Sequence, residues 1–457
     1  NYNVVVGDEA GTAITTGDYN VALGYNAGGS VTTGVNNTLV GGFSGDAITT
    51  GQYNTLYGYR SGTAITDAEY NVGLGGDALF TNTTGDNNTA VGQAALYSNT
   101  TASNNTAVGR SALVANTTGA NNVAVGSLAL DANTTGGENT AVGYHSLSTA
   151  TTADNNTAFG YTALRDNTSG TSNLAVGVNT LRLNTTASNN TGVGAFALDV
   201  NTTGASNTAL GSAALGANTT AANNTAVGYS ALKASTTGAN NVAVGALALD
   251  ANTTADNNTA VGNGALTGNT TGAQNTSLGT NALASNTTGD YNNAFGFQAV
   301  YGNLTGTELV GVGHNTLFAN TTGSYNTAIG GFSLDANTTA SNNTAVGYAS
   351  LSANTTGTYN VALGTSAGAA VTTGVQNTFI GGLAGDATDD GTNNVAVGFE
   401  ALSANCGSSN TSVGTRAGKA TTADNNTFVG NNAGTANTTA SNNTAVGASA
   451  LLVNTIG

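Results

Sequence analysis

A repeat of seventeen residues runs through the whole chain and constrains its fold more than any other feature. A glycine that ends a short apolar run, here called the pivot glycine, recurs every 17 residues from Gly7 to Gly398. It then falls at Gly414, Gly430 and Gly447, after intervals of 16, 16 and 17 residues, which makes 27 repeats. A short fixed period predicts a solenoid with one repeat per turn. No segment lies outside the repeat, so residues 1–457 are predicted to form a single continuous domain without linkers.

Two positions of the repeat carry the strongest constraints. Positions are numbered here from the pivot glycine, negative before it and positive after it. Position −4 is Asn in 26 of the 27 repeats, with Leu309 as the exception. Side-chain amides stacked turn over turn can donate and accept along the stack, so this position predicts an asparagine ladder. Its representatives are Asn88, Asn105, Asn122 and Asn258.

Position −1 is large and apolar in every repeat, as at Val91, Val108 and Val261, and it is expected to face a core. The pivot glycines, such as Gly92 and Gly262, are expected at corners that need a positive φ or a close backbone approach.

Variation between repeats indicates which positions pack together. Position +4 is Leu or Val in nineteen repeats, as at Leu96 and Leu266, and Gly in the other eight. In five of those eight, position −2 grows to Val, Leu or Phe, and in five, position +7 becomes Ile or Val instead of the usual Asn. Because a lost core leucine costs about 2 to 5 kcal/mol, this exchange predicts that positions −2, +4 and +7 share one packing layer.

These patterns predict an all-β fold, a parallel β-solenoid (β-roll or β-helix) with 27 turns of about 17 residues. The chain contains no Pro, as expected if backbone N–H groups bond to the turns above and below. The alternative is a disordered Asn/Thr/Gly tract. Disorder would enforce neither a strict period nor compensating core volumes, so the solenoid is favoured.

The composition argues against catalysis and against several partners. A net charge of −16 disfavours nucleic acid and acidic lipid, and no apolar run is long enough to insert into a membrane. Only His145, His314 and Cys406 could supply common catalytic or metal-binding groups besides the carboxylates, and they are far apart in sequence. We therefore expect no enzyme activity, cofactor or metal site. Asp at position +5 could suggest calcium, but the calcium-binding β-roll pattern is absent; these residues are Asp131, Asp199, Asp250 and Asp335.

Several surface features leave their roles open. The 16 tyrosines fall mostly at positions −5 and +1, where they could stack on sugars, pack on a sister chain, or stack on one another. About 28 Asn-x-Ser/Thr triplets could accept N-linked sugar, although an Asn/Thr-rich repeat generates them automatically. Threonine pairs in each repeat raise ice binding as a weaker possibility, because the Thr-x-Thr strand spacing is not the pattern here.

The string Asn-Asn-Thr-Ala-Val-Gly, seen at residues 87–92 and 442–447, resembles the head repeats of YadA-like trimeric autotransporter adhesins. Related arrays occur in fibre-like proteins of phages. The resemblance implies left-handed parallel β-rolls, assembled as trimers outside the cell. The repeat of this chain departs from the family by a longer arm, Asn-Thr-Thr-Gly.

The two ends of the sequence match in register. Joining Gly457 to Asn1 would restore a 17-residue interval between pivot glycines. We expect either head-to-tail stacking into a filament or an excerpt of a longer repeat tract. The residues expected at the stacking ends are Asn1, Asn3, Val6, Val446, Leu451 and Gly457.

The sequence thus predicts a non-enzymatic structural protein of the cell exterior or of a virion fibre. Its expected partner is itself, head to tail, with lateral or trimeric association and glycan binding as further candidates. The alternative function is an adhesin head that binds glycans or, less favoured, an ice-binding protein.

Overall fold

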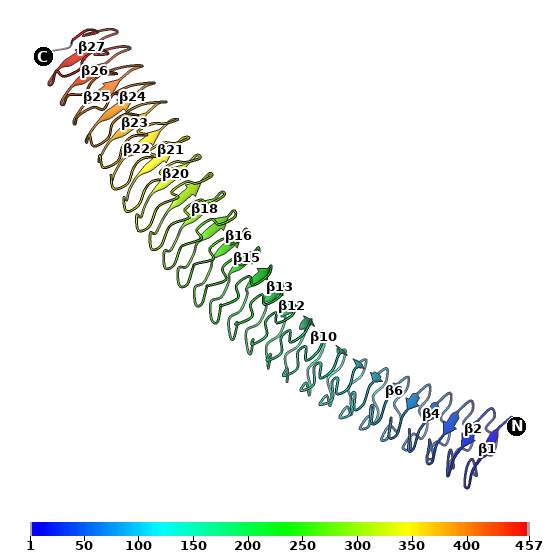
Figure 1. Cartoon of the computed structure of the whole chain (residues 1–457). Helices are drawn as coiled ribbons and strands as arrows, with labels where there is room; N and C mark the ends of the chain where they lie inside the picture. Colours follow the sequence, from blue (N-terminus) through cyan, green and yellow to red (C-terminus); the bar gives the residue numbers. More distant parts are fainter. Residues whose placement is uncertain (1, 455–457) are drawn as a thin grey trace. The chain divides into compact units, whose positions relative to one another are not determined.

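The computed structural model describes residues 2–454 as two compact units, each a parallel β-solenoid. Unit 1 comprises Asn1–Ala226 and unit 2 comprises Val227–Gly457. The division falls within strand β14 (Thr225–Val227), so no linker sequence separates the units, and the repeat is the same in both. The described residues contain 27 strands and no helix. Figure 1 shows the turns stacked one on another within each unit, with the strand at one edge of each turn.

Each turn contributes one strand of three residues, at positions −3 to −1. The strands of unit 1 are β1 (Val4–Val6), β2 (Val21–Leu23), β3 (Thr38–Val40), β4 (Thr55–Tyr57), β5 (Val72–Leu74), β6 (Thr89–Val91), β7 (Thr106–Val108), β8 (Val123–Val125), β9 (Thr140–Val142), β10 (Thr157–Phe159), β11 (Leu174–Val176), β12 (Thr191–Val193) and β13 (Thr208–Leu210). The strands of unit 2 are β15 (Val242–Val244), β16 (Thr259–Val261), β17 (Thr276–Leu278), β18 (Asn293–Phe295), β19 (Val310–Val312), β20 (Thr327–Ile329), β21 (Thr344–Val346), β22 (Val361–Leu363), β23 (Thr378–Ile380), β24 (Val395–Val397), β25 (Thr411–Val413), β26 (Thr427–Val429) and β27 (Thr444–Val446).

Consecutive strands within a unit pair in parallel and in exact repeat register. In the β6–β7 pair, for example, Thr89 lies opposite Thr106 and Val91 opposite Val108. Hydrogen bonds between turns continue well beyond the strands: the N–H groups of Ala94, Leu96 and Ser98 all donate to carbonyls of neighbouring turns. Three-residue strands would not be stable alone, so each turn depends on its neighbours. This use of backbone N–H groups explains the absence of proline.

The pivot glycines occupy corners that only glycine tolerates. Their φ values lie between 120° and 144°, and a Cβ on Gly262 would come within 2.5 Å of the carbonyl oxygen of Gly279 in the next turn. Both expectations for this position, a positive φ and a close backbone approach, are confirmed.

The core of each turn is formed by positions −2, +3 and +4, where residues such as Ala90, Ala95 and Leu96 are fully buried. The predicted packing layer is confirmed. A Cβ on Gly45, at position +4, would lie 2.8 Å from side-chain carbons of both Ile48 at +7 and Leu39 at −2. The larger residues therefore fill the space that a leucine occupies in other turns.

The prediction that position −1 faces the core is wrong. Val91, Val108 and Val261 are only partly buried, and many of their equivalents are exposed, including Leu23, Tyr57 and Phe159. The reason is the strand pleat: alternate side chains point to opposite faces, so when Ala at −2 points inward, −3 and −1 must point outward. The apolar core is therefore smaller than the sequence indicated, and polar amides line much of the remaining interior.

Candidate functional site

The asparagines at position −4 form the predicted ladder, with a different hydrogen-bond pattern from a simple amide stack. Asn88 is fully buried, its Oδ1 accepts the backbone N–H of Asn105 at 3.0 Å, and its Nδ2 donates to the carbonyl of Ala102 at 2.9 Å. Asn105, Asn122 and Asn258 are bonded in the same way. Each amide therefore ties its own turn together and links it to the next.

A second ladder, at position +7, was not predicted. Asn99 is fully buried and its Nδ2 donates to Oδ1 of Asn82 in the preceding turn at 2.9 Å. The same Nδ2 also donates to the carbonyl of Ala102 at 2.9 Å, so this carbonyl at position +10 accepts from both ladders. The signal was present in the sequence, since turns with Leu at +4 usually carry Asn at +7.

The +7 ladder has gaps that leave buried polar atoms without partners. Oδ1 of Asn133 has no hydrogen-bond partner because the next turn carries Ala150 at +7. Oδ1 of Asn354 is left in the same state where Val371 follows. The −4 ladder is also modified once: Leu309 donates its backbone N–H to Asn292 Oδ1 at 3.0 Å but has no amide for the following turn.

Threonines at position +8 form a third set of contacts between turns. The hydroxyl of Thr100 donates to the backbone carbonyl of Thr117 at 3.1 Å, and the hydroxyl of Thr117 donates to the backbone carbonyl of Thr134 at 2.9 Å. Because these hydroxyls already donate within the chain, the +8 row does not offer ordered donors to an external lattice, whereas the threonines at +9, such as Thr101 and Thr118, are exposed. The ice-binding alternative stays a prediction.

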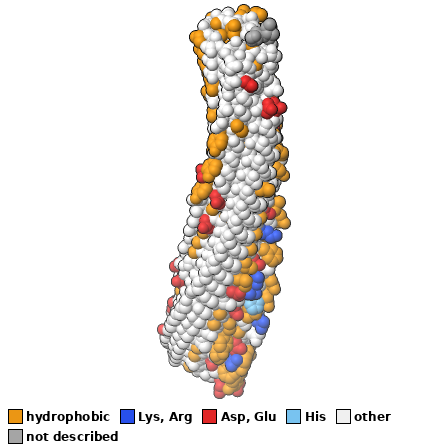
Figure 2. Space-filling view, turned by 90° about the vertical axis from the view of Figure 1, so that its left-hand side faces the viewer, with side chains coloured by type: hydrophobic (Ala, Val, Ile, Leu, Met, Phe, Trp, Pro, Cys, Tyr) orange, Lys and Arg blue, Asp and Glu red, His pale blue; other side chains and the backbone are white. Residues whose placement is uncertain are grey.

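Large apolar side chains lie in rows on the outside of the turns, on and beside the strands. We call the side chains at positions −5, −3, −1 and +1 the outer face. Figure 2 shows hydrophobic side chains following the stacking direction, with few and scattered charges. Turns are numbered by their pivot glycines, so that turn 2 contains Gly24 and turn 5 contains Gly75. Within turns 2 to 5 of unit 1, eight residues of the outer face are between 38% and 61% exposed: Tyr19, Leu23, Tyr25, Tyr53, Tyr57, Tyr59, Tyr70 and Leu74.

Many tyrosines stack on an aromatic ring of the next turn, one of the alternatives left open by the sequence. The rings of Tyr53 and Tyr70 are 5.0 Å apart and inclined by 4°, and those of Tyr144 and Tyr161 are 5.6 Å apart. Stacked rings cover one another's faces, so they present their edges to the outside. No ring contact is recorded for Tyr57 within residues 2–454, and it is 61% exposed.

The two histidines lie in different units and make aromatic contacts. His145 packs edge-on against Tyr144, and His314 lies 5.5 Å from Phe297 and 5.0 Å from Phe332 between ring centroids. Within the described part of the chain, no group of three or more His, Cys, Asp or Glu side chains could hold a metal ion. The expectations of no catalysis and no cofactor stay predictions.

Cys406 lies between strands, outside any regular element, and is buried. Its side chain is 2% exposed, and its Sγ lies 3.1 Å from the hydroxyl of Thr388. Burial raises the pKa of this thiol, which makes it a poor nucleophile.

The aspartates at position +5 do not share a common partner. Oδ1 of Asp199 lies 2.8 Å from Nε of Arg182 in an ion pair. In Asp131 and Asp335, by contrast, Oδ1 is buried without a hydrogen bond. Burial raises the pKa of the Asp131 and Asp335 carboxyls. Five of the seven basic side chains pair with carboxylates of the same or the adjacent turn: Arg60, Arg165, Arg182, Arg416 and Lys419.

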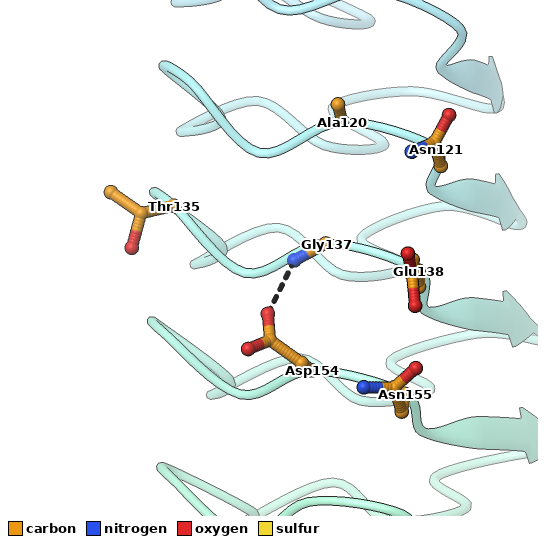
Figure 3. A pocket seen from close by; sticks show the side chains of 7 residues that line it. All are labelled: Ala120, Asn121, Thr135, Gly137, Glu138, Asp154 and Asn155. Carbon is orange, nitrogen blue, oxygen red and sulfur yellow. Dashed lines mark hydrogen bonds between the residues drawn. The ribbon is translucent and has the colours of Figure 1, made fainter.

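A shallow polar groove of about 310 Å³ lies where position −6 is glycine. Figure 3 shows Glu138 and Asp154 on successive turns, with Thr135 of the arm across from them. Asp154 accepts the N–H of Gly137 at 2.7 Å. The groove therefore exists because Gly137 has no side chain to fill it. Of its two carboxylates, that of Asp154 already accepts a backbone N–H.

The residues predicted for the stacking ends belong to the first and last turns. Asn3 is bonded as an ordinary ladder residue, to Gly17 and Asn20, while Val6, Val446 and Leu451 are exposed. Asn1 and Gly457 lie outside the described residues. Head-to-tail stacking stays a prediction.

No protein-family model matches the chain, and no curated protein matches it significantly. Residues 2–454 include no helix long and apolar enough to cross a membrane. The likeness to YadA-like head repeats thus rests on the repeat motif alone.

Proposed function

We propose that this chain is a non-enzymatic structural protein that forms the shaft of an extracellular or cell-surface fibre. The observation that carries the proposal is the set of three ladders, at positions −4, +7 and +8, that link neighbouring turns through buried or half-buried hydrogen bonds, with the +7 ladder interrupted in some turns. Extracellular location and fibre assembly are further supported by the likeness of the repeat to adhesin heads and phage fibres.

The interior is organised for strength rather than for binding. Leucine, alanine and hydrogen-bonded amides fill each turn, and the amide carbonyls at position +10 use both of their acceptor sites. Buried hydrogen bonds contribute about 1 kcal/mol each when satisfied and cost more when broken. A chain with several such bonds per turn resists local opening along its length.

Lateral association between copies is the second part of the proposal. Aromatic side chains bury ~150–250 Å² each when covered, so the six half-exposed Tyr residues of turns 2 to 5, together with Leu23 and Leu74, present on the order of 800 Å². A stable protein interface needs ~800 Å² from each partner. The eight residues come from the second, fourth and fifth turns, and a second copy of the chain has the same spacing between turns, which allows contacts to stay in register.

Electron microscopy and sedimentation of the purified chain test the proposal. Filaments or side-by-side bundles are expected, and Leu23→Lys with Tyr57→Lys should disperse the bundles without changing the circular dichroism. As a matched control, lysine at the exposed arm residues Thr118 and Thr203 should leave them intact. A monodisperse single rod at all concentrations would overturn the assembly proposal.

Glycan binding is kept as a second candidate because of Tyr57. Its 61% exposed ring has no stacking partner among the described residues and could lie against a sugar. Binding to a glycan array that is lost on Tyr57→Ala, but retained on Tyr53→Ala, would favour this function.

A further inference from the structure

The 28 Asn-x-Ser/Thr triplets, which look equivalent in the sequence, fall into two classes in the structure. Sixteen have their Asn at position +7 and two at −4, and all eighteen of these Asn side chains are buried. Ten have their Asn at −5, where nine are exposed and Asn36 is half-buried. The nine exposed acceptors are Asn87, Asn104, Asn155, Asn189, Asn223, Asn257, Asn342, Asn425 and Asn442.

The buried class cannot accept a sugar in the folded chain. Asn99, for example, is 0% exposed and uses its Nδ2 in bonds to Asn82 and Ala102. A sugar on that nitrogen would replace one of its two N–H groups, so at least one of these hydrogen bonds would be lost, and the sugar would have no space inside the turn.

The exposed class has an accessible carboxamide on a fixed backbone. Asn189 has φ of 62° and donates its backbone N–H to the carbonyl of Thr171 at 3.1 Å, while its side chain is exposed. Thr191, the third residue of the triplet, is partly exposed on the outer face of β12. Both side chains that a glycosyltransferase reads are therefore accessible.

The residue type at position −5 changes along the chain. Tyr fills it in seven turns, all between residues 2 and 70 or between 291 and 359, whereas the turns from 87 to 274 carry Asn, Ser, Glu or Gln there. From Asn155 to Asn257 the triplets recur in every second turn. Within unit 1 this places Asn155, Asn189 and Asn223 two turns apart, about 10 Å at the usual strand spacing, which leaves room for a sugar on each.

We propose that the nine exposed asparagines at position −5 are sites of N-linked glycosylation on the folded chain, with a nucleotide-activated hexose as the sugar donor. The Nδ2 of the Asn would form a bond to C1 of the hexose as the bond from C1 to the phosphate oxygen breaks. The nucleoside diphosphate leaves with the electron pair, and the amide loses one proton to a base of the transferase. Addition after folding is required, because addition to the buried class would prevent the ladders from forming.

Purified full-length chain, incubated with a soluble Asn-x-Ser/Thr-specific transferase and a nucleotide-activated hexose, tests the proposal. Intact mass above the 44.3 kDa of the sequence and peptide mapping give the sites. We expect hexose at position −5 and none at +7, with modification at +7 appearing only in chain that was unfolded before the reaction. Hexose at +7 in the folded chain, or no hexose at −5, would overturn the proposal.

Thr191→Val provides the matched variant. Val follows Asn-Asn naturally at Val123, Val242 and Val395, so the fold should be unaffected. Hexose should then be lost from Asn189 alone, with all other sites unchanged. Retention of hexose at Asn189 would show that the reaction does not read the triplet and would contradict the proposal.

Discussion

At the scale of single residues, the backbone conformation of a position limits which residue types it favours more than side-chain chemistry does. Leu at position +4 adopts a left-handed conformation, with φ near 50° at Leu96 and Leu266, which costs roughly 1 kcal/mol per residue relative to glycine. The eight turns with Gly there avoid this cost, and seven of them carry a larger apolar residue at −2, at +7 or at both. Asn at −5 has φ near 60°, which Asn tolerates better than most residues.

Gly262→Ala should strongly destabilise its turn. The Cβ would lie 2.5 Å from the carbonyl oxygen of Gly279 at a φ of +137°, and the resulting backbone shift is expected to cost at least ~2 kcal/mol. Gly331→Ala, where the nearest atoms lie at 3.7 Å or more, is the control and should be close to neutral. Thermal unfolding and amide exchange of the two variants measure the difference; equal effects would contradict the assigned role of the pivot glycine.

Asp335 should make stability depend on pH. Burial raises the pKa of its carboxyl, so between the unfolded and the folded pKa the folded chain binds more protons. Its contribution to stability therefore grows as the pH falls through the folded pKa and is complete below the unfolded pKa. Asp335→Asn should raise the melting temperature at pH 7 and reduce this acid-side gain. Asp390→Asn, which removes the same charge from an exposed turn, serves as the control.

At the scale of the repeat, the turn is held by polar ladders as much as by its apolar core. The −4 ladder was predictable because its Asn recurs almost without exception, and the packing layer because three positions vary together. The +7 ladder was missed because Asn, Ile, Val and Thr share that position. The prediction that position −1 faces the core was wrong because an apolar residue in every repeat is compatible with a row on the outside as well as with a core. Only the pleat of the strand distinguishes the two arrangements.

Ala150→Asn should extend the +7 ladder and stabilise unit 1. The new amide would donate to Oδ1 of Asn133, which has no partner, and could accept from Asn167 in the next turn. A gain of about 1 kcal/mol is expected in thermal unfolding. Ala150→Leu has a similar shape without the donor, so an equal gain from both variants would contradict the ladder explanation.

Leu266→Gly should cost about 2 to 5 kcal/mol through the cavity that it leaves at position +4. Adding Ala260→Leu at −2 reproduces the pairing of Leu39 with Gly45 and should recover part of that loss. A double-mutant cycle measures the coupling, expected at roughly 0.5 to 3 kcal/mol. Purely additive effects would show that the two positions do not share a packing layer.

At the scale of the whole molecule, each unit is a stack in which every turn contacts only its neighbours. Such a stack has no separate centre, and its stability is the sum of turns and of interfaces between them. Local damage should therefore spread over adjacent turns rather than unfold the unit at once. The low charge and the absence of proline are consequences of this arrangement, because charge is confined to the outward positions and backbone N–H groups are used between turns.

Thr259→Pro tests this view. The substitution removes the N–H that donates to the carbonyl of Asn275 at 2.8 Å, and an interior proline costs about 3 kcal/mol or more. Hydrogen exchange should lose protection in β16 and the turns beside it, while distant turns of unit 2 stay protected. Thr259→Val, which matches natural valines at position −3, is the control; uniform loss of protection across the unit would contradict the nearest-neighbour picture.

The sequence by itself determined the solenoid, the length and register of its turns, the corner glycines, the −4 ladder and the compensating core volumes. The period, the corner glycines and the Asn at −4 recur almost without exception, and the core volumes vary together between repeats, so comparison of the repeats alone exposes these features. Only the tertiary structure decided which face of the strand the position −1 residues occupy, that a second ladder shares the +10 carbonyls with the first, and which asparagines of the Asn-x-Ser/Thr triplets are accessible. Those properties depend on the direction in which a side chain leaves the backbone, which residue identity and spacing do not record.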